Sequence, residues 1–140
     1  MFMTPLVLEK IPYSSDMMVY SKLIYNGYNY EVYILPGMIT DGASVPKLFQ
    51  NIFPPYAGRY LESAVVHDGL YASEALPRKV CDDIFLEAMK SQGVAWWKRN
   101  IMYSAVRVAG WTVWNKHKPE KVKRNKEYVI VIEKDNYENN

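Results

Sequence analysis

The stretch MVYSKLIYNGYNYEVYIL, residues 18–35, decides the fold. Its two runs, residues 18–25 and 28–35, are rich in valine, isoleucine and tyrosine, which favours β-strands. Asn26-Gly27 lies between the runs, and this pair is typical of a two-residue hairpin turn because both positions must take positive φ. Pro36-Gly37 ends the second run. The stretch therefore predicts an antiparallel β-hairpin.

Downstream of the hairpin the pattern of apolar residues becomes helical. Residues 59–72 place apolar side chains at the spacing of one helix face. Pro77 suits the first turn of a helix and Gly93 suits the position after its end, which predicts a second helix between them. Residues 95–115 are apolar nearly all round. We therefore expect this third helix to be the central, most buried one.

Three further segments complete the predicted architecture. Residues 128–133, YVIVIE, favour a strand that returns to the N-terminal sheet, and residues 6–11 could add a strand before the hairpin. The basic run 116–126 is predicted to be a solvated connector. The predicted fold class is α+β, a small antiparallel sheet (N-terminal hairpin plus C-terminal strand) packed against about three helices. We expect a single domain over residues 1–140.

Composition excludes several classes of protein. Hydrophobic residues make up 49% and charged residues 23% of the chain, as in an ordinary globular protein. The net charge of +2 gives no strong nucleic-acid signal. The single cysteine, Cys81, excludes an internal disulfide and a multi-thiolate zinc site. The 12 tyrosines and 4 tryptophans suit core packing, pockets or interfaces, and they make a homodimer possible.

Targeting signals are not evident in the sequence. Residues 1–16 contain no basic region, long apolar segment or cleavage pattern of a signal peptide. The most apolar later stretch, residues 101–114, is too short to span a bilayer and carries Arg107. We therefore expect a cytoplasmic protein without a transmembrane segment.

The loop TDGASVP, residues 40–46, joins the predicted sheet to the helices. Thr40, Asp41 and Ser44 could hydrogen-bond the amides of the loop itself, as is common in turns, and Gly42 permits backbone geometry that other residues avoid. Alternatively, the loop could offer a carboxylate and carbonyls to a cation, or N–H groups to an anion. The sequence leaves both interpretations open.

The segment HDGLY, residues 67–71, groups an imidazole, a carboxylate and a phenol on one helix. If the next helix packs antiparallel to it, Asp82 lies opposite His67 or Tyr71. A catalytic base needs an orienting acceptor, and a pair of His67 with Asp82 would supply one. Asp68 would then be able to hold a metal ion or polarise a water.

A structural explanation of the same residues competes with the catalytic one. A buried polar network that fixes two helices is common in proteins. Arg107, on a mostly apolar helix, could pair with Asp41, Asp68 or Asp82. If it does, the whole constellation is a structural charge network, and the hydrolase interpretation fails. Gly69 inside the helix costs about 1 kcal/mol relative to alanine, which is explained if another group approaches the backbone there.

A series of short segments carries a resemblance to a known family. In order, they are Thr40–Pro46, Pro54-Pro55, residues 64–68 (AVVHD) with Tyr71, Arg78 and Asp82 with Phe85 and Met89, and Val106-Arg107 with Gly110. Over residues 35–111 the chain resembles the bacterial and phage family catalogued as domain of unknown function 1353. This resemblance implies a phage or prophage origin, which places the protein in the host cytoplasm.

A more distant resemblance is to the catalytic helices of secreted and parvoviral phospholipases A2. Those enzymes are similar in having His-Asp-x-x-Tyr on one helix and an aspartate on the next. The resemblance implies that His67 is a general base, that Asp68 is a ligand of Ca²⁺ or another divalent cation, and that Tyr71 and Asp82 orient the base. Because Ca²⁺ needs further oxygen ligands, Asp41 and nearby carbonyls would complete the site.

Three functions follow from these patterns. The first is a metal-assisted ester or phosphoester hydrolase with catalytic His67, Tyr71 and Asp82. The second is a non-enzymatic phage protein that binds or sequesters a host component, such as a defence protein or a nucleotide signal. The third is a minor virion or tail component. For ligand binding we assign Thr40, Gly42, Ser44, Arg78 and Arg107.

Overall fold

The computed structural model describes residues 1–40 and 59–135. The predicted hairpin is present as β3 (Leu23–Asn26) and β4 (Tyr30–Ile34). β6 (Val129–Glu133) adds to it, so that one antiparallel sheet has the strand order β3-β4-β6. The prediction that the C-terminal strand returns to the hairpin is therefore confirmed.

The hairpin turn lies two residues later than predicted. Asn26 is paired with Glu31, and the Gly27 N–H donates to the carbonyl of Tyr30 at 2.9 Å. The turn is therefore made by Tyr28 and Asn29, and Asn26-Gly27 belong to the ladder. A Cβ on Gly27 would lie 2.6 Å from a carboxylate oxygen of Glu87. This glycine leaves room both for the carboxylate of Glu87 and for the backbone carbonyl of Tyr30, which would lie 2.9 Å from the same Cβ.

A second small sheet has the order β1-β2-β5, made of β1 (Leu8–Lys10), β2 (Met17–Val19) and β5 (Ile39–Thr40). The predicted continuous strand over residues 18–25 is thus divided between two sheets. Gly37, whose φ is +100°, turns the chain after β4, and Ile39–Thr40 then pair with β2.

Four helices are present in the described residues: α1 (Leu61–Ser73), α2 (Arg78–Ser91), α3 (Trp96–Trp114) and α4 (Pro119–Asn125). A short 3-10 turn, Lys126–Tyr128, leads from α4 into β6. The α+β class is confirmed. Residues 116–126 are mostly exposed, as predicted, but they are not only a connector: they contain α4, which begins at a proline and is anchored by the buried Val122.

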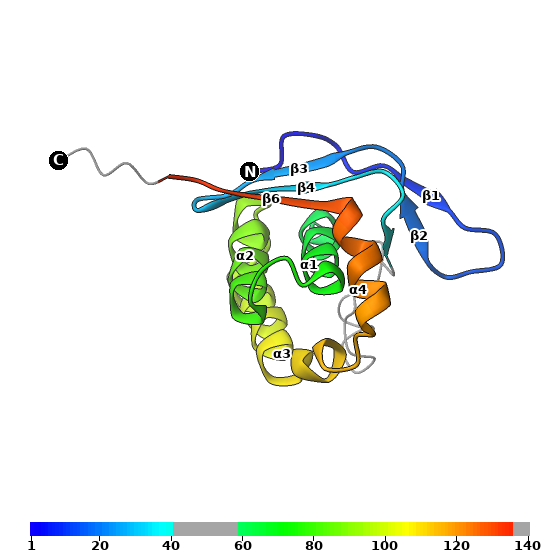
Figure 1. Ribbon diagram of the computed structural model, residues 1–140. Helices are drawn as coiled ribbons and strands as arrows, with labels where there is room; N and C mark the ends of the chain where they lie inside the picture. Colours follow the sequence, from blue (N-terminus) through cyan, green and yellow to red (C-terminus); the bar gives the residue numbers. More distant parts are fainter. Residues whose placement is uncertain (41–58, 136–140) are drawn as a thin grey trace.

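Helix α1 is the central helix. In Figure 1 it lies beneath the β3-β4-β6 sheet, between α2 and α4. A Cβ on Gly69 would lie 2.7 Å from Cδ1 of Ile34, so the glycine lets the helix backbone approach the sheet. Val65, Val66 and Leu70 of α1 are fully buried in the core.

The prediction that the third helix is the most buried one is wrong. Helix α3 lies on the side of α2 that faces away from the sheet (Figure 1), and it packs chiefly against α2. Its buried residues are Met102 and Gly110. An apolar composition all round does not reveal which faces are covered, and here a whole face of α3 is exposed. No described helix is long and apolar enough to cross a membrane.

Candidate functional site

The buried carboxylate of Asp82 is the centre of the site. Asp82 has no exposed surface. Its Oδ1 accepts a hydrogen bond from the Tyr71 hydroxyl at 2.6 Å and contacts Nε2 of His67 at 2.7 Å. Both partners come from α1, whereas Asp82 is on α2. The predicted pairing of His67 and Asp82 across two helices is confirmed.

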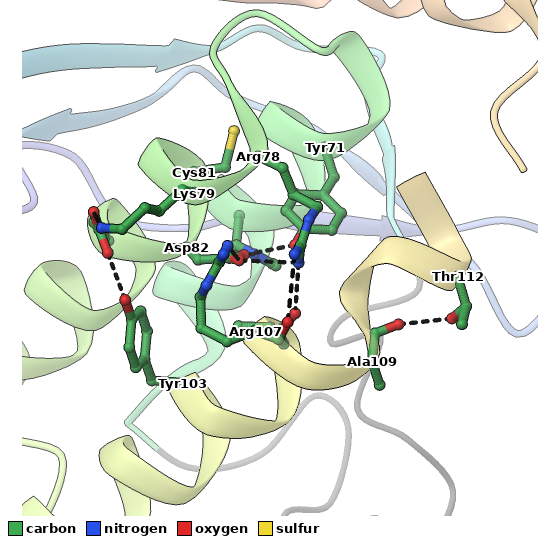
Figure 2. Close-up of polar contacts among 12 residues, drawn as sticks. Tyr71, Arg78, Lys79, Cys81, Asp82, Tyr103, Arg107, Ala109 and Thr112 are labelled. Carbon is green, nitrogen blue, oxygen red and sulfur yellow. Dashed lines mark hydrogen bonds and ion pairs between the residues drawn. The ribbon is translucent and has the colours of Figure 1, made fainter. Parts of the chain in front are cut away.

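Two arginines contact the other oxygen of the same carboxylate. Nη1 of Arg107 donates to Oδ2 at 2.7 Å and Nη1 of Arg78 at 3.4 Å. Arg78 also donates to the backbone carbonyls of Val106, at 3.0 Å, and of Arg107, at 3.3 Å. Figure 2 shows the two guanidinium groups converging on Asp82 from α2 and α3. One carboxylate therefore joins three helices.

Local sequence explains how these side chains meet. His67 and Tyr71 are one helical turn apart on α1, and Arg78 and Asp82 are one turn apart on α2. Glu74 takes a left-handed backbone (φ +48°) and ends α1. The short connection that follows turns the chain so that α2 packs back along α1. The N-terminal turns of α2 therefore lie opposite the C-terminal turns of α1.

The charge of Asp82 is stabilised in place. Burial alone would raise the pKa of this carboxyl, but hydrogen bonds from His67, Tyr71 and Arg107 outweigh burial and lower the pKa below 3.8. Asp82 is therefore ionised at neutral pH. An ionised carboxylate accepts hydrogen bonds only, so the proton in its contact with His67 belongs to Nε2 of the imidazole.

His67 is held as a neutral imidazole. Burial lowers its pKa below 6.5, and this effect outweighs the opposing attraction of Asp82. With the single proton on Nε2, the other ring nitrogen, Nδ1, carries a lone pair. The ring stacks against Phe85, with centroids 4.6 Å apart, and lies 4.2 Å from the ring of Tyr71. The imidazole is thus held in one orientation, with its lone pair at Nδ1.

Neither neighbouring acidic group is a nucleophile at neutral pH. Burial raises the pKa of the Cys81 thiol to about 12. Burial and the hydrogen bond to Asp82 raise the pKa of the Tyr71 phenol well above its usual value of 10. Tyr71 therefore acts as a hydrogen-bond donor, and Cys81 is an inert core residue.

The pairing of Arg107 with Asp82 is the contact for which we expected a purely structural charge network and no hydrolase. It is present, but it occupies Oδ2, whereas His67 and Tyr71 share Oδ1. The arginine pair and the histidine pair are therefore made at the same time. A structural role for Arg107 does not remove the orienting contact to His67.

The structure brings together His67, Tyr71, Arg78, Asp82 and Arg107. Two other predicted site residues are described, but they are not among the contacts of Asp82. Thr40 is buried at the end of β5, and Asp68 is half-buried on α1. Asp41, Gly42 and Ser44 lie outside the described residues.

The described residues contain no cluster of acidic, histidine or cysteine side chains of the kind that binds a divalent cation. No group of three or more His, Cys, Asp or Glu side chains that could hold a metal is present in residues 1–40 and 59–135. Asp68 supplies at most one carboxylate, whereas Ca²⁺ takes six to eight oxygen ligands. Of the groups that the resemblance implies for a calcium site, only Asp68 is among the described residues, so that site stays a prediction.

Two contributors to the site were not assigned a role from sequence. Phe85 forms the wall on which His67 stacks, and its position one turn after Asp82 on the same helix is the signal that could have identified it. Gly110 of α3 faces Tyr71: a Cβ there would lie 2.5 Å from the Tyr71 hydroxyl. A glycine within a helix of this composition was the available signal.

Together these features define a class of protein: a small α+β domain with a buried carboxylate at the junction of three helices. The chain belongs to the family described as "Protein of unknown function (DUF1353)", whose family model matches residues 17–106. The family named from the sequence is confirmed, although the match begins before residue 35 and ends before residue 111.

One curated relative is an uncharacterized protein, y4jT, of Sinorhizobium fredii (strain NBRC 101917 / NGR234). It is 39% identical over 82 residues, which cover 55% of this chain and 24% of the relative. The chain thus spans about a quarter of that protein. No solved structure matches the chain. None of these comparisons shows the resemblance to phospholipases A2.

Proposed function

We propose that this protein hydrolyses an ester or phosphoester bond, with His67 as the general base. One observation carries the proposal: the ionised Asp82 accepts a hydrogen bond of 2.7 Å from Nε2–H of a neutral His67, so that Nδ1 is a proton acceptor in a fixed orientation. This is the arrangement that a histidine needs to activate water.

In the proposed reaction, His67 alone transfers the proton from water to the leaving group. Nδ1 of His67 accepts a proton from water as the water oxygen attacks the carbonyl carbon or the phosphorus. The imidazolium then returns this proton to the leaving alkoxide, and the products are an acid and an alcohol. Asp82 keeps the Nε2–H tautomer throughout and stabilises the imidazolium, as a third group does in related dyads.

Tyr71, Arg78 and Arg107 are positioning residues in this proposal. They act on Asp82 rather than on the substrate. Their donors keep the carboxylate ionised and fixed, so that its charge faces His67 in one orientation only. Loss of the Tyr71 hydroxyl should therefore weaken turnover less than loss of the imidazole.

The test compares wild type with His67→Gln on p-nitrophenyl acyl esters, on bis-p-nitrophenyl phosphate and on phospholipid vesicles. We expect turnover in wild type that falls about 10²-fold or more in His67→Gln, while circular dichroism and melting show an intact fold. Because the pKa of His67 is lowered, the acid limb of kcat/KM should lie below pH 6.5. Equal rates for the two proteins on every substrate would refute the proposal.

The alternative, a binding protein without catalysis, has its own outcome in the same experiment. It predicts that neither protein turns over any of these substrates, and that His67→Gln lowers only stability. The contact that favours this alternative is the Arg107–Asp82 ion pair, because a buried carboxylate shared by three helices also suits a structural role.

A further inference from the structure

Helix α3 carries a stripe of exposed apolar side chains. We define the α3 stripe by Trp97, Ile101, Ser104, Val108 and Trp111. The four apolar members are 39–74% exposed, which is unusual for large side chains on one helix. Contiguous exposed apolar surface of this kind marks an interaction site.

The spacing of the stripe is that of a helix–helix interface. Its members follow one another at intervals of 4, 3, 4 and 3 residues, the pattern of the apolar seam in paired helices. At about 100° per residue they fall within an arc of roughly 80°. Met102 and Gly110, which are buried on the α2 side, lie on the opposite face. The stripe is therefore a second face of α3, separate from the one already packed.

The order of residues in the stripe is the same in both directions. Reading outward from Ser104, each side has an aliphatic residue and then a tryptophan: Ile101 and Trp97 in one direction, Val108 and Trp111 in the other. A two-fold interface needs a self-complementary surface of this kind. In an antiparallel pair, Ile101 faces Val108 of the second copy and Trp97 faces its Trp111. The small Ser104 then lies on the axis, where two helices approach most closely.

Charge also favours the antiparallel orientation. Helix α3 contains Lys98, Arg99 and Arg107 and no acidic residue. A parallel pair would place the Lys98-Arg99 segments of both copies side by side. An antiparallel pair places them at opposite ends of the interface, where repulsion is weaker and is screened by salt.

We propose that the α3 stripe is the interface of a homodimer in which two copies of α3 pack antiparallel about Ser104. Two tryptophans and two aliphatic residues make a small interface compared with the roughly 800 Å² per partner of standard complexes. The dimer therefore dissociates on dilution. This inference does not depend on the hydrolase proposal, since no member of the stripe contacts Asp82.

Sedimentation equilibrium over a series of concentrations tests the dimer, with charge reversal as the test of orientation. Ile101→Lys and Val108→Glu, each alone, should weaken dimerisation about tenfold or more, because a charge then faces an apolar residue. The double variant Ile101→Lys/Val108→Glu should regain dimerisation, because in the antiparallel pair each new lysine faces a new glutamate. The matched control is Val113→Glu, an exposed valine of α3 outside the stripe.

A cross-linking measurement checks the axis independently. Ser104→Cys should form an intermolecular disulfide on mild oxidation, whereas Val113→Cys should not, and the native Cys81 is buried and does not compete. A wild type that stays monomeric at every soluble concentration overturns the proposal. So does a double variant weaker than both single variants. Binding of monomers to anionic vesicles through the stripe, without dimers, would also overturn it and assign the face to a membrane.

Discussion

Gly110 lies directly against the hydroxyl of Tyr71: a Cβ built on the glycine would come within 2.5 Å of that oxygen. The same Cβ would lie 3.1 Å from Nη1 of Arg78. A methyl group at this position must therefore displace one of the donors to Asp82, or move α3 away from α2. The glycine links helix packing to the geometry of the site.

Gly110→Ala should destabilise the protein by about 1–3 kcal/mol, as overpacking usually does, despite the better helix propensity of alanine. In a Tyr71→Phe background the same change should cost less than half as much, because the nearest oxygen is gone. Urea unfolding of the four proteins in a double-mutant cycle measures the coupling. Additive effects would show that Tyr71 and Gly110 are not in contact.

Asp82→Asn should be strongly destabilising. It keeps the shape of the side chain but leaves Arg107 without its anionic partner, and breaking a buried pair in this way costs about 3–5 kcal/mol. The adjacent Asp83 is a matched control because it also pairs with a basic side chain, Lys79, at 2.7 Å but is partly exposed. Asp83→Asn should change the free energy of unfolding much less. Similar losses in the two variants would contradict the assigned role of Asp82.

The pH dependence of stability should report His67. Its pKa is lowered by folding, so the unfolded chain takes up a proton as the pH falls below 6.5 while the folded protein does not. The free energy of unfolding should therefore decrease from neutral pH down to about pH 5. His67→Gln should flatten this slope. The measurement is urea unfolding across this range of pH.

A second loss of stability belongs to Asp82 and lies at lower pH. Because its pKa is lowered below 3.8, its contribution is complete above that value and is lost as the pH falls through the folded pKa. Acid unfolding monitored by circular dichroism should show this step in wild type. The step should be missing in Asp82→Asn.

Gly69→Ala should be destabilising because its Cβ would lie 2.7 Å from Cδ1 of Ile34. Removing that methyl group with Ile34→Val should recover part of the loss, although Ile34→Val alone costs about 0.5–1.5 kcal/mol. Thermal melting of the two single variants and the double variant is sufficient. A double variant as unstable as the sum of the single variants would exclude this contact as the reason for the glycine.

The site was more predictable from sequence than the packing of the third helix. His67, Tyr71 and Asp82 are placed by helix periodicity and by a short connection, both of which are local properties. The exposure of Trp97 and Val108 depends on which other elements cover α3, and apolar periodicity contains no information on that. The helix at Pro119 was missed because a single buried valine anchors it.

The hairpin shows the same distinction. The valine, isoleucine and tyrosine content of residues 18–35 was sufficient to predict β-structure, but not the division of residues 18–25 between two sheets. The register of the hairpin could not be predicted, because the carboxylate of Glu87, on a helix distant in sequence, lies against Gly27 and accepts a hydrogen bond from the Tyr28 N–H. Likewise, β2 and β3 join different sheets, because β2 pairs with Ile39–Thr40, which follow the turn at Gly37. These outcomes depend on contacts far apart in the sequence.

Helix α3 buries Met102 and Gly110, and it is also held to α2 by the Arg107–Asp82 ion pair and by the Arg78 bonds to its carbonyls. Local opening of this helix should therefore depend on the protonation state of Asp82. Amide hydrogens of α3 should exchange with solvent as one cooperative unit together with those of α2, and that unit should loosen in acid before the sheet does. Protonation of the Asp82 carboxylate should therefore weaken the attachment of α3 to α2.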